Sequence, residues 1–214
     1  IEAVTPEGLK DVYKDFNLAG EELVERLQTF RKHGVYVLGS FIFGLPSDRP
    51  GTFDATAELA KRADITFAQF VTLTPFPGTL DHEQWEREEG DNMPMVDGIP
   101  VSRHWLIPQT RRPKLLTPHP VMTGEQIRLG TQNVWNNFYS LKASWKRSDI
   151  LIALRNRVAF VVASKVMLHA FGNTGLSTDS ARASRATQLG GIGFSLLQKM
   201  FSARPMPDLQ VPTA

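Results

Sequence analysis

Two apolar segments, residues 35–43 and 65–74, constrain the fold more than any other feature of the chain. The first, VYVLGSFIF, is nearly continuous in apolar and β-branched residues. Such a run is typical of a strand that is buried on both faces, as strands of parallel sheets are. The second, ITFAQFVTLT, has the same character, and it follows after about 30 residues, which is the length of one βαβ unit. The sequence therefore predicts two parallel strands.

A helical pattern precedes each predicted strand. Residues 21–32 carry apolar side chains at helical spacing, and residues 52–62 have the composition of a helix. A short helix is also predicted from about residue 5 to residue 13, where Thr and Pro form a typical helix start. Helices and strands that alternate over short connections predict an α/β fold, either a parallel sheet or a (β/α) barrel. Because two strands complete neither, we expect upstream strands or a partner to cover the remaining edges.

The chain divides into three predicted regions. Residues 1–80 hold both strands. Residues 81–122 contain many prolines and are predicted to be an ordered, wrapped loop or a linker, because a connection of this length is uncommon without a function. Residues 123–214 are predicted to be a mainly helical extension. Its expected helices cover residues 123–145, 148–171 and 184–201.

Composition excludes several kinds of site. The chain has no cysteine, which excludes a disulfide framework, a thiolate zinc site and an iron–sulfur cluster held by four cysteines of this chain. Its five histidines show no metal-binding spacing, and no P-loop or GxSxG motif is present. No run approaches the roughly 20 apolar residues that span a bilayer, so a cytoplasmic protein is expected. The first residue is Ile rather than Met, which favours a piece cut from a longer protein.

The net charge of +2 conceals a strong asymmetry. Residues 1–100 hold 9 Lys and Arg against 18 Asp and Glu, whereas residues 101–214 hold 15 against 4. Within residues 142–204, apolar and basic residues alternate in a way that fits an amphipathic helix at an anionic membrane surface. A helix packed on the sheet with a solvated basic face is the other interpretation. Nucleic-acid binding is a third, although no recognition motif accompanies the charge.

The ends of the two predicted strands are candidate binding positions, because ligands bind at the carboxyl ends of parallel strands. The first exit, residues 39–46, contains two glycines that permit close approach of a ligand or another backbone. At the second exit, Pro75 and Pro77 fix the chain on either side of Phe76. Taken singly, each segment is more typical of a buried strand followed by a tight turn.

Several motifs, taken in order, resemble the radical S-adenosylmethionine (radical SAM) enzymes. The pattern Gly39-x-x-Ile42-x-Gly44-x-Pro46 is similar to the fifth-strand motif of that family, in which the strand packs beside the adenine. With residues 2–7, 14–17 and 74–79, it resembles the subgroup that carries an N-terminal cobalamin-binding domain. That subgroup includes the anaerobic magnesium-protoporphyrin monomethyl ester cyclases and hopanoid-synthesis proteins. The matches cover about residues 1–80.

The resemblance implies a site for S-adenosylmethionine (SAM) at the strand ends. Glu2 would contact the ribose, although a solvated terminus is an equal alternative. Gly39, Ser40, Ile42 and Gly44 would line the adenine side. The turn after the second strand, residues 75–79, would shape the opposite side of the site. The residues that the resemblance implies as cofactor-binding are Glu2, Gly39, Ser40, Ile42, Gly44, Pro75, Phe76 and Pro77.

The resemblance also implies how the intact enzyme would work. A 4Fe–4S cluster would cleave SAM and start radical chemistry on an unreactive carbon, with cobalamin as a second cofactor. The CxxxCxxC loop that ligates the cluster is absent from this chain, so the chain alone is expected to be inactive. We therefore expect the C-terminal part of a (β/α) partial TIM barrel with a helical extension. Its expected partners are a missing barrel half, a cobalamin-binding domain and a small-molecule or lipid substrate.

Two other hypotheses remain from the sequence. The first is a non-catalytic module whose basic helices dock on an anionic membrane or on a partner protein. The second is a small α/β protein that binds phosphoesters, which the missing phosphate motif disfavours.

Overall fold

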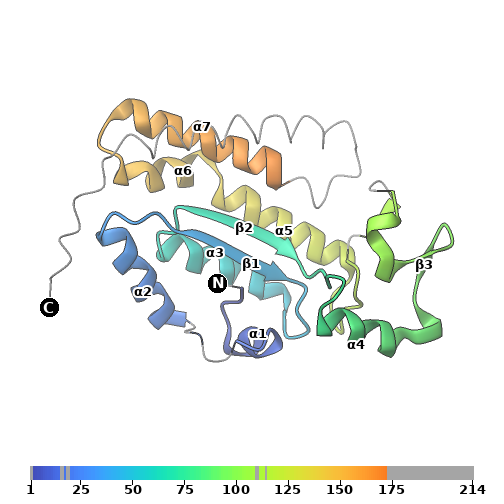
Figure 1. Ribbon diagram of the computed structural model, residues 1–214. Coiled ribbons are helices and arrows are strands. Elements are labelled where there is room, and N and C mark those ends of the chain that lie inside the picture. Colours follow the sequence, from blue (N-terminus) through green and yellow to red (C-terminus); the bar gives the residue numbers. More distant parts are fainter. Residues whose placement is uncertain (1, 15–16, 18–19, 109–110, 114, 173–214) are drawn as a thin grey trace, which may run out of the picture.

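The structure, a computed structural model, describes residues 2–14, 17, 20–108, 111–113 and 115–172 (Figure 1). The predicted helix over residues 184–201 lies outside them. The α-helices are α1 (Pro6–Asp11), α2 (Gly20–Lys32), α3 (Pro50–Arg62), α4 (Leu80–Glu89), α5 (Gly124–Phe138), α6 (Leu141–Arg147) and α7 (Leu154–Phe171). The strands are β1 (Leu38–Phe43), β2 (Phe67–Thr72), β3 (Met95–Val96) and β4 (Ile99–Pro100), and the 3-10 helices are η1 (Gly90–Asn92), η2 (Val101–Leu106) and η4 (Ser148–Ile150).

Strands β1 and β2 form the parallel pair that the sequence predicts. Leu38 lies opposite Phe67, and Phe43 lies opposite Thr72. Helix α3 connects the two strands, which makes β1-α3-β2 a βαβ unit. The described part of the chain is therefore of the α/β class.

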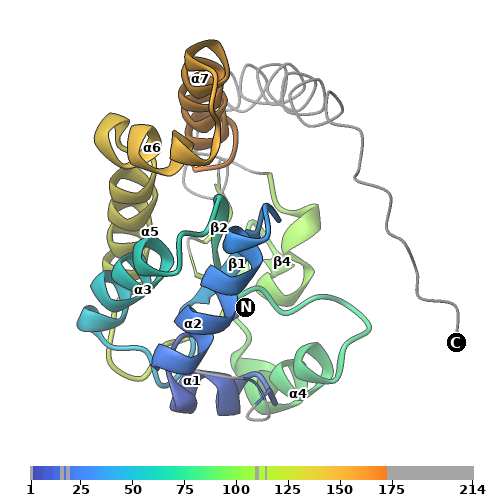
Figure 2. The same ribbon diagram turned by 90° about the vertical axis from the view of Figure 1, so that its left-hand side faces the viewer.

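One face of this sheet carries the core. Phe41 and Phe43 of β1 stack on Phe70 of β2, with ring centroids 5.4 Å and 6.2 Å apart. Phe53 of α3 meets Phe43 at 4.7 Å, and Trp135 of α5 meets the Phe70 ring edge-on at 5.5 Å. Figure 2 shows α3 and α5 together on this side of the sheet. Aromatic pairs of this kind contribute about 0.5 to 1.5 kcal/mol each beyond their area burial.

The other face of the sheet is only partly covered, with Phe67 buried against Phe160 of α7 and its other residues half-buried or exposed, so the expectation of strands buried on both faces was wrong. The exposed fraction is 62% for Leu38 of β1 and 41% for Val71 of β2. Side chains of β1 alternate between this face and the core, as in a sheet with one packed layer. The apolar run misled the prediction because the described residues supply no complete layer on this face.

The outer edge of β2 is closed by the side chains of Trp135 of α5 and of Tyr139, the residue that follows this helix. The Ala68 N–H donates to the Tyr139 hydroxyl (3.0 Å), and the same hydroxyl donates to the Ala68 carbonyl (2.8 Å). The Trp135 indole N–H donates to the Phe70 carbonyl (2.8 Å). Tyr139 and Trp135 are buried. Because side chains satisfy these buried backbone groups, the sheet ends at β2.

The outer edge of β1 has no comparable cover. Among the described residues, one hydrogen bond crosses this edge, from the Ile42 N–H to the Glu2 carbonyl (2.8 Å). The chain at Glu2 therefore lies beside β1, on the side away from β2. An edge that leaves backbone groups unpaired is a template for a further strand.

The helical region is divided where the sequence analysis expected continuous helices. Helix α5 ends at Phe138, and α6 begins after Ser140, whose hydroxyl accepts a hydrogen bond from the Ala143 N–H (3.3 Å). Serine is a strong N-cap residue, so it favours a new helix start at this point. The helix expected over residues 148–171 is likewise divided into η4 and α7.

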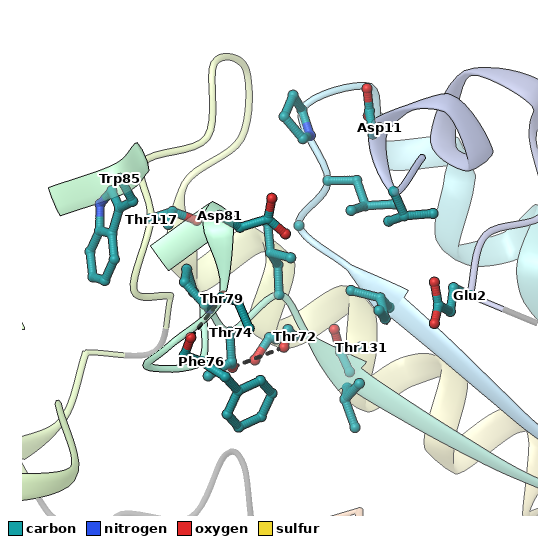
Figure 3. A pocket seen from close by; sticks show the side chains of 18 of the residues that line it. Glu2, Asp11, Thr72, Thr74, Phe76, Thr79, Asp81, Trp85, Thr117 and Thr131 are labelled. Carbon is teal, nitrogen blue, oxygen red and sulfur yellow. Dashed lines mark hydrogen bonds between the residues drawn. The ribbon is translucent and has the colours of Figure 1, made fainter. Parts of the chain in front are cut away.

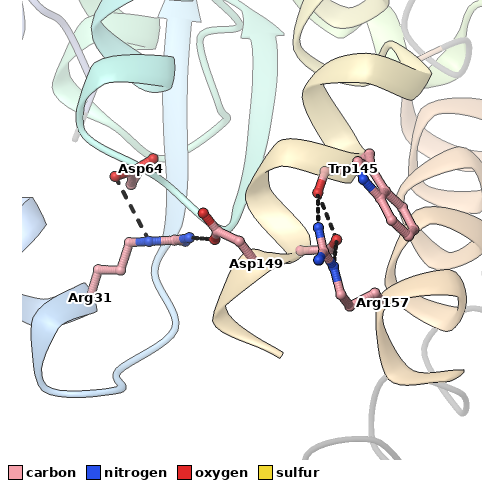
Figure 4. Close-up of polar contacts among 6 residues, drawn as sticks. Arg31, Asp64, Trp145, Asp149 and Arg157 are labelled. Carbon is pink, nitrogen blue, oxygen red and sulfur yellow. Dashed lines mark hydrogen bonds and ion pairs between the residues drawn. The ribbon is translucent and has the colours of Figure 1, made fainter. Parts of the chain in front are cut away.

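Polar contacts join the helical region to α2 and the amino-terminal end of the sheet, and they also join α6 to α7 (Figure 4). Arg31 of α2 pairs with Asp149 of η4 and lies 3.8 Å from Asp64, which precedes β2. Arg157 of α7 donates to the Trp145 carbonyl (3.3 Å) and stacks 4.3 Å above the Trp145 ring. These contacts lie at the end of the sheet opposite the strand exits.

The described residues between 81 and 122 form a small layer of their own. Strands β3 and β4 pair as an antiparallel hairpin around Asp97 and Gly98, which adopt positive φ as tight hairpin turns require. Trp85 of α4 packs with Val101 and Ile107 in a separate apolar cluster. The layer lies beside the carboxyl ends of β1 and β2 (Figure 1).

Candidate functional site

A cleft of about 950 Å³ lies at the carboxyl ends of β1 and β2 (Figure 3). We call it the strand-end cleft. Its walls come from the end of α1, the exit of β1, residues 70–76 and Thr79, helix α4, residues 117–118, the inner side of α5 and the end of α7. This volume is within the range of small-molecule sites. The position matches the rule that ligands of parallel sheets bind at the carboxyl ends of the strands.

The β1 wall is a tight turn that begins at Gly44. Gly44 has φ of +92°, a conformation that favours glycine. The Asp48 carboxylate accepts hydrogen bonds from the N–H groups of Gly44 (2.8 Å) and Leu45 (3.0 Å). Asp48 is buried, and burial raises the pKa of its carboxyl, although these two hydrogen bonds oppose the shift. The turn is thus stabilised from within.

The β2 wall leads directly into α4. The Thr74 hydroxyl donates to the Thr72 carbonyl (3.1 Å), which folds the exit back on the strand. Thr79 caps α4 by accepting from the His82 N–H (3.3 Å), and its hydroxyl donates to the Phe76 carbonyl (2.7 Å). Phe76 remains 64% exposed. This wall therefore offers an exposed aromatic ring on a fixed backbone.

The cleft is acidic. The described residues that line it include five carboxylates, Glu2, Asp11, Asp81, Glu88 and Glu89, against one cationic side chain. That cation, Lys14, is paired with Glu2 at 2.7 Å. A cleft with an excess of one sign of charge attracts ligands of the opposite sign. The electrostatics favour a cationic ligand.

The structure brings together five of the residues that the resemblance singled out. Glu2, Ile42, Gly44, Pro75 and Phe76 all line the cleft, although their contact with a ligand stays a prediction.

The remaining predicted residues lie elsewhere. Gly39 faces the core, where a Cβ would meet the ring of Phe41 at 3.0 Å and Ile65 at 3.1 Å, so close packing accounts for this glycine. Ser40 lies on the same face of β1 as Ile42 but nearer the amino-terminal end of the strand, outside the cleft. Pro77 lies on the turn after β2, also outside the cleft.

Sequence reasoning did not select Asp11, Asp48 or His119, all of which shape the cleft. The Asp11 carboxylate accepts from the Ser47 N–H (2.9 Å) of the β1 turn. His119 contacts the same turn from 74 residues away. Only Asp48 had a local signal, because Asp commonly bonds to backbone N–H groups a few residues away in turns.

Comparisons with known proteins give two relatives. Over 139 residues the chain is 30% identical to an uncharacterized methyltransferase of Pyrococcus horikoshii, and this match covers 65% of the chain. Over 84 residues it is 38% identical to the bacteriochlorophyllide d C-12(1)-methyltransferase of Chlorobaculum tepidum, which covers 39% of the chain. Both relatives are named methyltransferases. No protein-family model and no solved structure matches the chain.

The matches extend over only a part of each relative. They span 28% of the Pyrococcus protein and 18% of the Chlorobaculum protein. The activity of the relatives as whole proteins is therefore carried over to this chain only as a proposal.

These relatives correct the assignment to radical SAM chemistry. Their names specify methyl transfer, and they give no support to a radical SAM enzyme, a 4Fe–4S cluster or a cobalamin-binding domain. The chain itself has no cysteine to ligate a cluster. The alternative of a non-catalytic basic docking module also finds no support in these names.

The expected contact of the basic region with an anionic membrane stays untested, and residues 173–214 of this region lie outside the described residues. Within the described ranges, no helix has the length and apolar character needed to cross a bilayer. No three His, Asp or Glu side chains gather as a metal site among those residues.

Proposed function

We propose that this chain is part of a SAM-dependent methyltransferase and that the strand-end cleft binds SAM. The observation that carries the proposal is the acidic cleft at the carboxyl ends of two parallel strands, in a chain whose relatives are named methyltransferases. Neither observation suffices alone, because a parallel sheet hosts many functions and a name does not locate a site.

The residues of the cleft fit the methyl donor. SAM carries a positive sulfonium, a positive ammonium and one negative carboxylate, so it is a net cation, and the carboxylates of Asp81, Glu88 and Glu89 supply complementary charge. The adenine is flat and largely apolar. Ile42 and the exposed ring of Phe76 offer surfaces against which such a ring can stack.

The charge pattern also suits binding of the donor and release of the product. A nucleophilic atom of the acceptor bonds to the methyl carbon while the C–S bond breaks, and the electron pair of that bond passes to sulfur. The acceptor gives up a proton to solvent or to a base, and the sulfonium becomes a neutral thioether. An acidic cleft therefore binds the cationic donor more tightly than the neutral product, so the product leaves more readily than the donor.

We further propose that the sheet continues beyond β1 in the intact protein, as part of a (β/α) barrel. The open edge of β1 and the exposed face around Leu38 and Val71 support this proposal. Residues 1–80 would then be the barrel portion, residues 81–122 the layer over its strand ends, and residues 123–214 a helical extension. The acceptor would bind where these parts meet.

Calorimetry on the full chain tests the proposed function. We expect SAM to bind more tightly than S-adenosylhomocysteine, its neutral product. We also expect the affinity for SAM to fall as the salt concentration is raised. A chain that binds neither molecule, or both equally at every salt concentration, would contradict the proposal.

Two double variants, one inside the cleft and one outside it, test where SAM binds. Substituting Glu88→Gln and Glu89→Gln removes two charges from the cleft, and we expect a three- to tenfold (on the order of 1 kcal/mol) loss of SAM affinity. Substituting Glu22→Gln and Glu25→Gln removes two exposed charges from α2, outside the cleft. If both pairs weaken binding equally, SAM binds elsewhere or responds only to net charge.

A further inference from the structure

Two segments that are distant in sequence meet at the mouth of the strand-end cleft. One is the turn after β1, of which Gly44 and Leu45 line the cleft. The other is the segment before α5, of which Thr117 and Pro118 line it. The next residue, His119, bridges the two segments.

Every ring nitrogen of His119 has a partner. Nε2 lies 2.9 Å from the Leu45 carbonyl oxygen. Nδ1 lies 3.1 Å from the Val121 N and 2.9 Å from the Met122 N. Because backbone N–H groups only donate, Nδ1 is the acceptor and Nε2 carries the proton that is donated to Leu45. One neutral imidazole thus holds its own segment with one nitrogen and the β1 turn with the other.

Further hydrogen bonds from residues near it in sequence, or in α1, also anchor the β1 turn. The Asp48 carboxylate accepts from the N–H groups of Gly44 and Leu45, and the Asp48 N–H donates to the Leu45 carbonyl (2.8 Å). The Asp11 carboxylate accepts from the Ser47 N–H. All of these anchors lie within residues 1–80. His119, in contrast, reaches the turn from the other wall of the cleft.

Packing supports the same contact. A Cβ built on Gly44 would lie 3.0 Å from Leu115 Cδ1, so the segment before α5 lies directly against the turn at two points. A shift of this segment would therefore disturb the backbone of the cleft, as well as the side chains.

We propose that His119 is a positioning residue that fixes the β1 turn and residues 117–122 as one wall of the strand-end cleft, in the form that receives the ligand. The inference rests on the proposed function for the identity of the ligand, and on the hydrogen bonds above for the mechanism. His119 does not itself line the cleft. It acts through the Leu45 carbonyl, and its loss would widen the cleft rather than remove a contact to the ligand.

Two substitutions separate the two bonds of the imidazole. In His119→Gln, the amide nitrogen reaches about as far as Nε2 and retains the donor to Leu45. In His119→Asn, the amide oxygen stands near the position of Nδ1 and retains the acceptor for Val121 and Met122 but loses the donor. A residue needed only to order its own segment would be replaced best by Asn, whereas the proposal requires that Gln be the better replacement.

The experiment measures SAM affinity and amide hydrogen exchange on the full chain with each variant. We expect His119→Asn to lose about tenfold in SAM affinity, the effect of one hydrogen bond in a partly buried site, and to exchange the Gly44 and Leu45 amides about tenfold faster. We expect His119→Gln to stay within about threefold of the parent chain in both. Unfolding midpoints of the two variants show whether either has lost its fold.

Each result decides between the claims. Equal losses in both variants, or wild-type affinity and exchange in His119→Asn, would overturn the positioning role. A parent chain that fails to bind SAM would count against the proposed function alone, because the exchange rates still support or overturn the role of His119.

Discussion

The two edges of the small parallel sheet are treated in opposite ways. At β2, Trp135 of α5 and Tyr139, which follows that helix, satisfy the outward-facing backbone groups of Phe70 and Ala68. At β1, the described residues supply one hydrogen bond, from Ile42 to Glu2. Side chains can therefore satisfy the backbone groups at the edge of a sheet in place of a further strand. The closed edge marks the limit of the sheet, and the open edge marks where the intact protein is expected to continue it.

The closed edge predicts the largest effect on stability. In Tyr139→Phe, the Ala68 N–H and carbonyl both lose their partner while they stay buried, so we expect a loss of roughly 2 to 5 kcal/mol in the free energy of unfolding. Urea denaturation measures it. The control is Tyr13→Phe, at a side chain that is 75% exposed, with an expected change within about 0.5 kcal/mol. Equal effects at the two tyrosines would mean that the edge is not held by the hydroxyl.

The same hydroxyl predicts a pH dependence at high pH. Burial raises the pKa of Tyr139 to about 12, against 10 in the unfolded chain. Between these values the unfolded state releases the phenolic proton and the folded state keeps it, so stability falls as pH rises. We expect this tyrosine to account for a loss of about 2 to 3 kcal/mol by pH 12.

The pH effect is isolated by comparing the parent chain with Tyr139→Phe in urea at pH 9 to 12. Phenolate absorbance should show one tyrosine that ionises last and that is missing from the variant. If the difference in unfolding free energy between the two proteins stays constant over this range, burial does not raise the pKa of the Tyr139 hydroxyl.

Trp135 should contribute less than Tyr139, because it satisfies one backbone group instead of two. We expect Trp135→Phe to cost about 1 to 3 kcal/mol, since the buried Phe70 carbonyl loses its donor. The matched control is Trp105→Phe, at a side chain that is 44% exposed. Circular dichroism melting curves compare the two. A larger effect at Trp105 would reverse the ranking of the two tryptophans.

The open side of the sheet predicts the smallest effect. Leu38 is 62% exposed beside the uncovered edge, so Leu38→Ser should change the unfolding free energy of this chain by no more than about 0.5 kcal/mol. In a longer protein whose sheet continues beyond β1, the same substitution should cost more, because the side chain would then be buried. Urea denaturation of both proteins checks this, and equal costs would argue against a continued sheet.

The features that were predictable from sequence are those with local signals. The strands over residues 35–43 and 65–74 and the helix over residues 21–32 follow from side-chain patterns, and the structure confirms all three with shifted ends. The break between α5 and α6 had a usable signal in Ser140 that the longer helical pattern concealed.

The features that were not predictable depend on contacts between distant residues. Tyr139 meets Ala68 across 71 residues, and His119 meets Leu45 across 74. No local pattern encodes such pairs. The exposed face of the sheet was missed for a related reason, because an apolar strand has the same sequence whether or not its second layer belongs to the described residues.

The measurement that tests the central claim most directly is a titration of the ¹⁵N-labelled full chain with SAM, followed by amide chemical shifts. The account predicts shifts at Ile42, Gly44 and Val71 around the strand-end cleft. The amide chemical shifts of α6, Arg31 and Asp149, at the other end of the sheet, should not change. Shifts confined to that far end, or none at millimolar SAM, would contradict the assignment of the cleft as the SAM site.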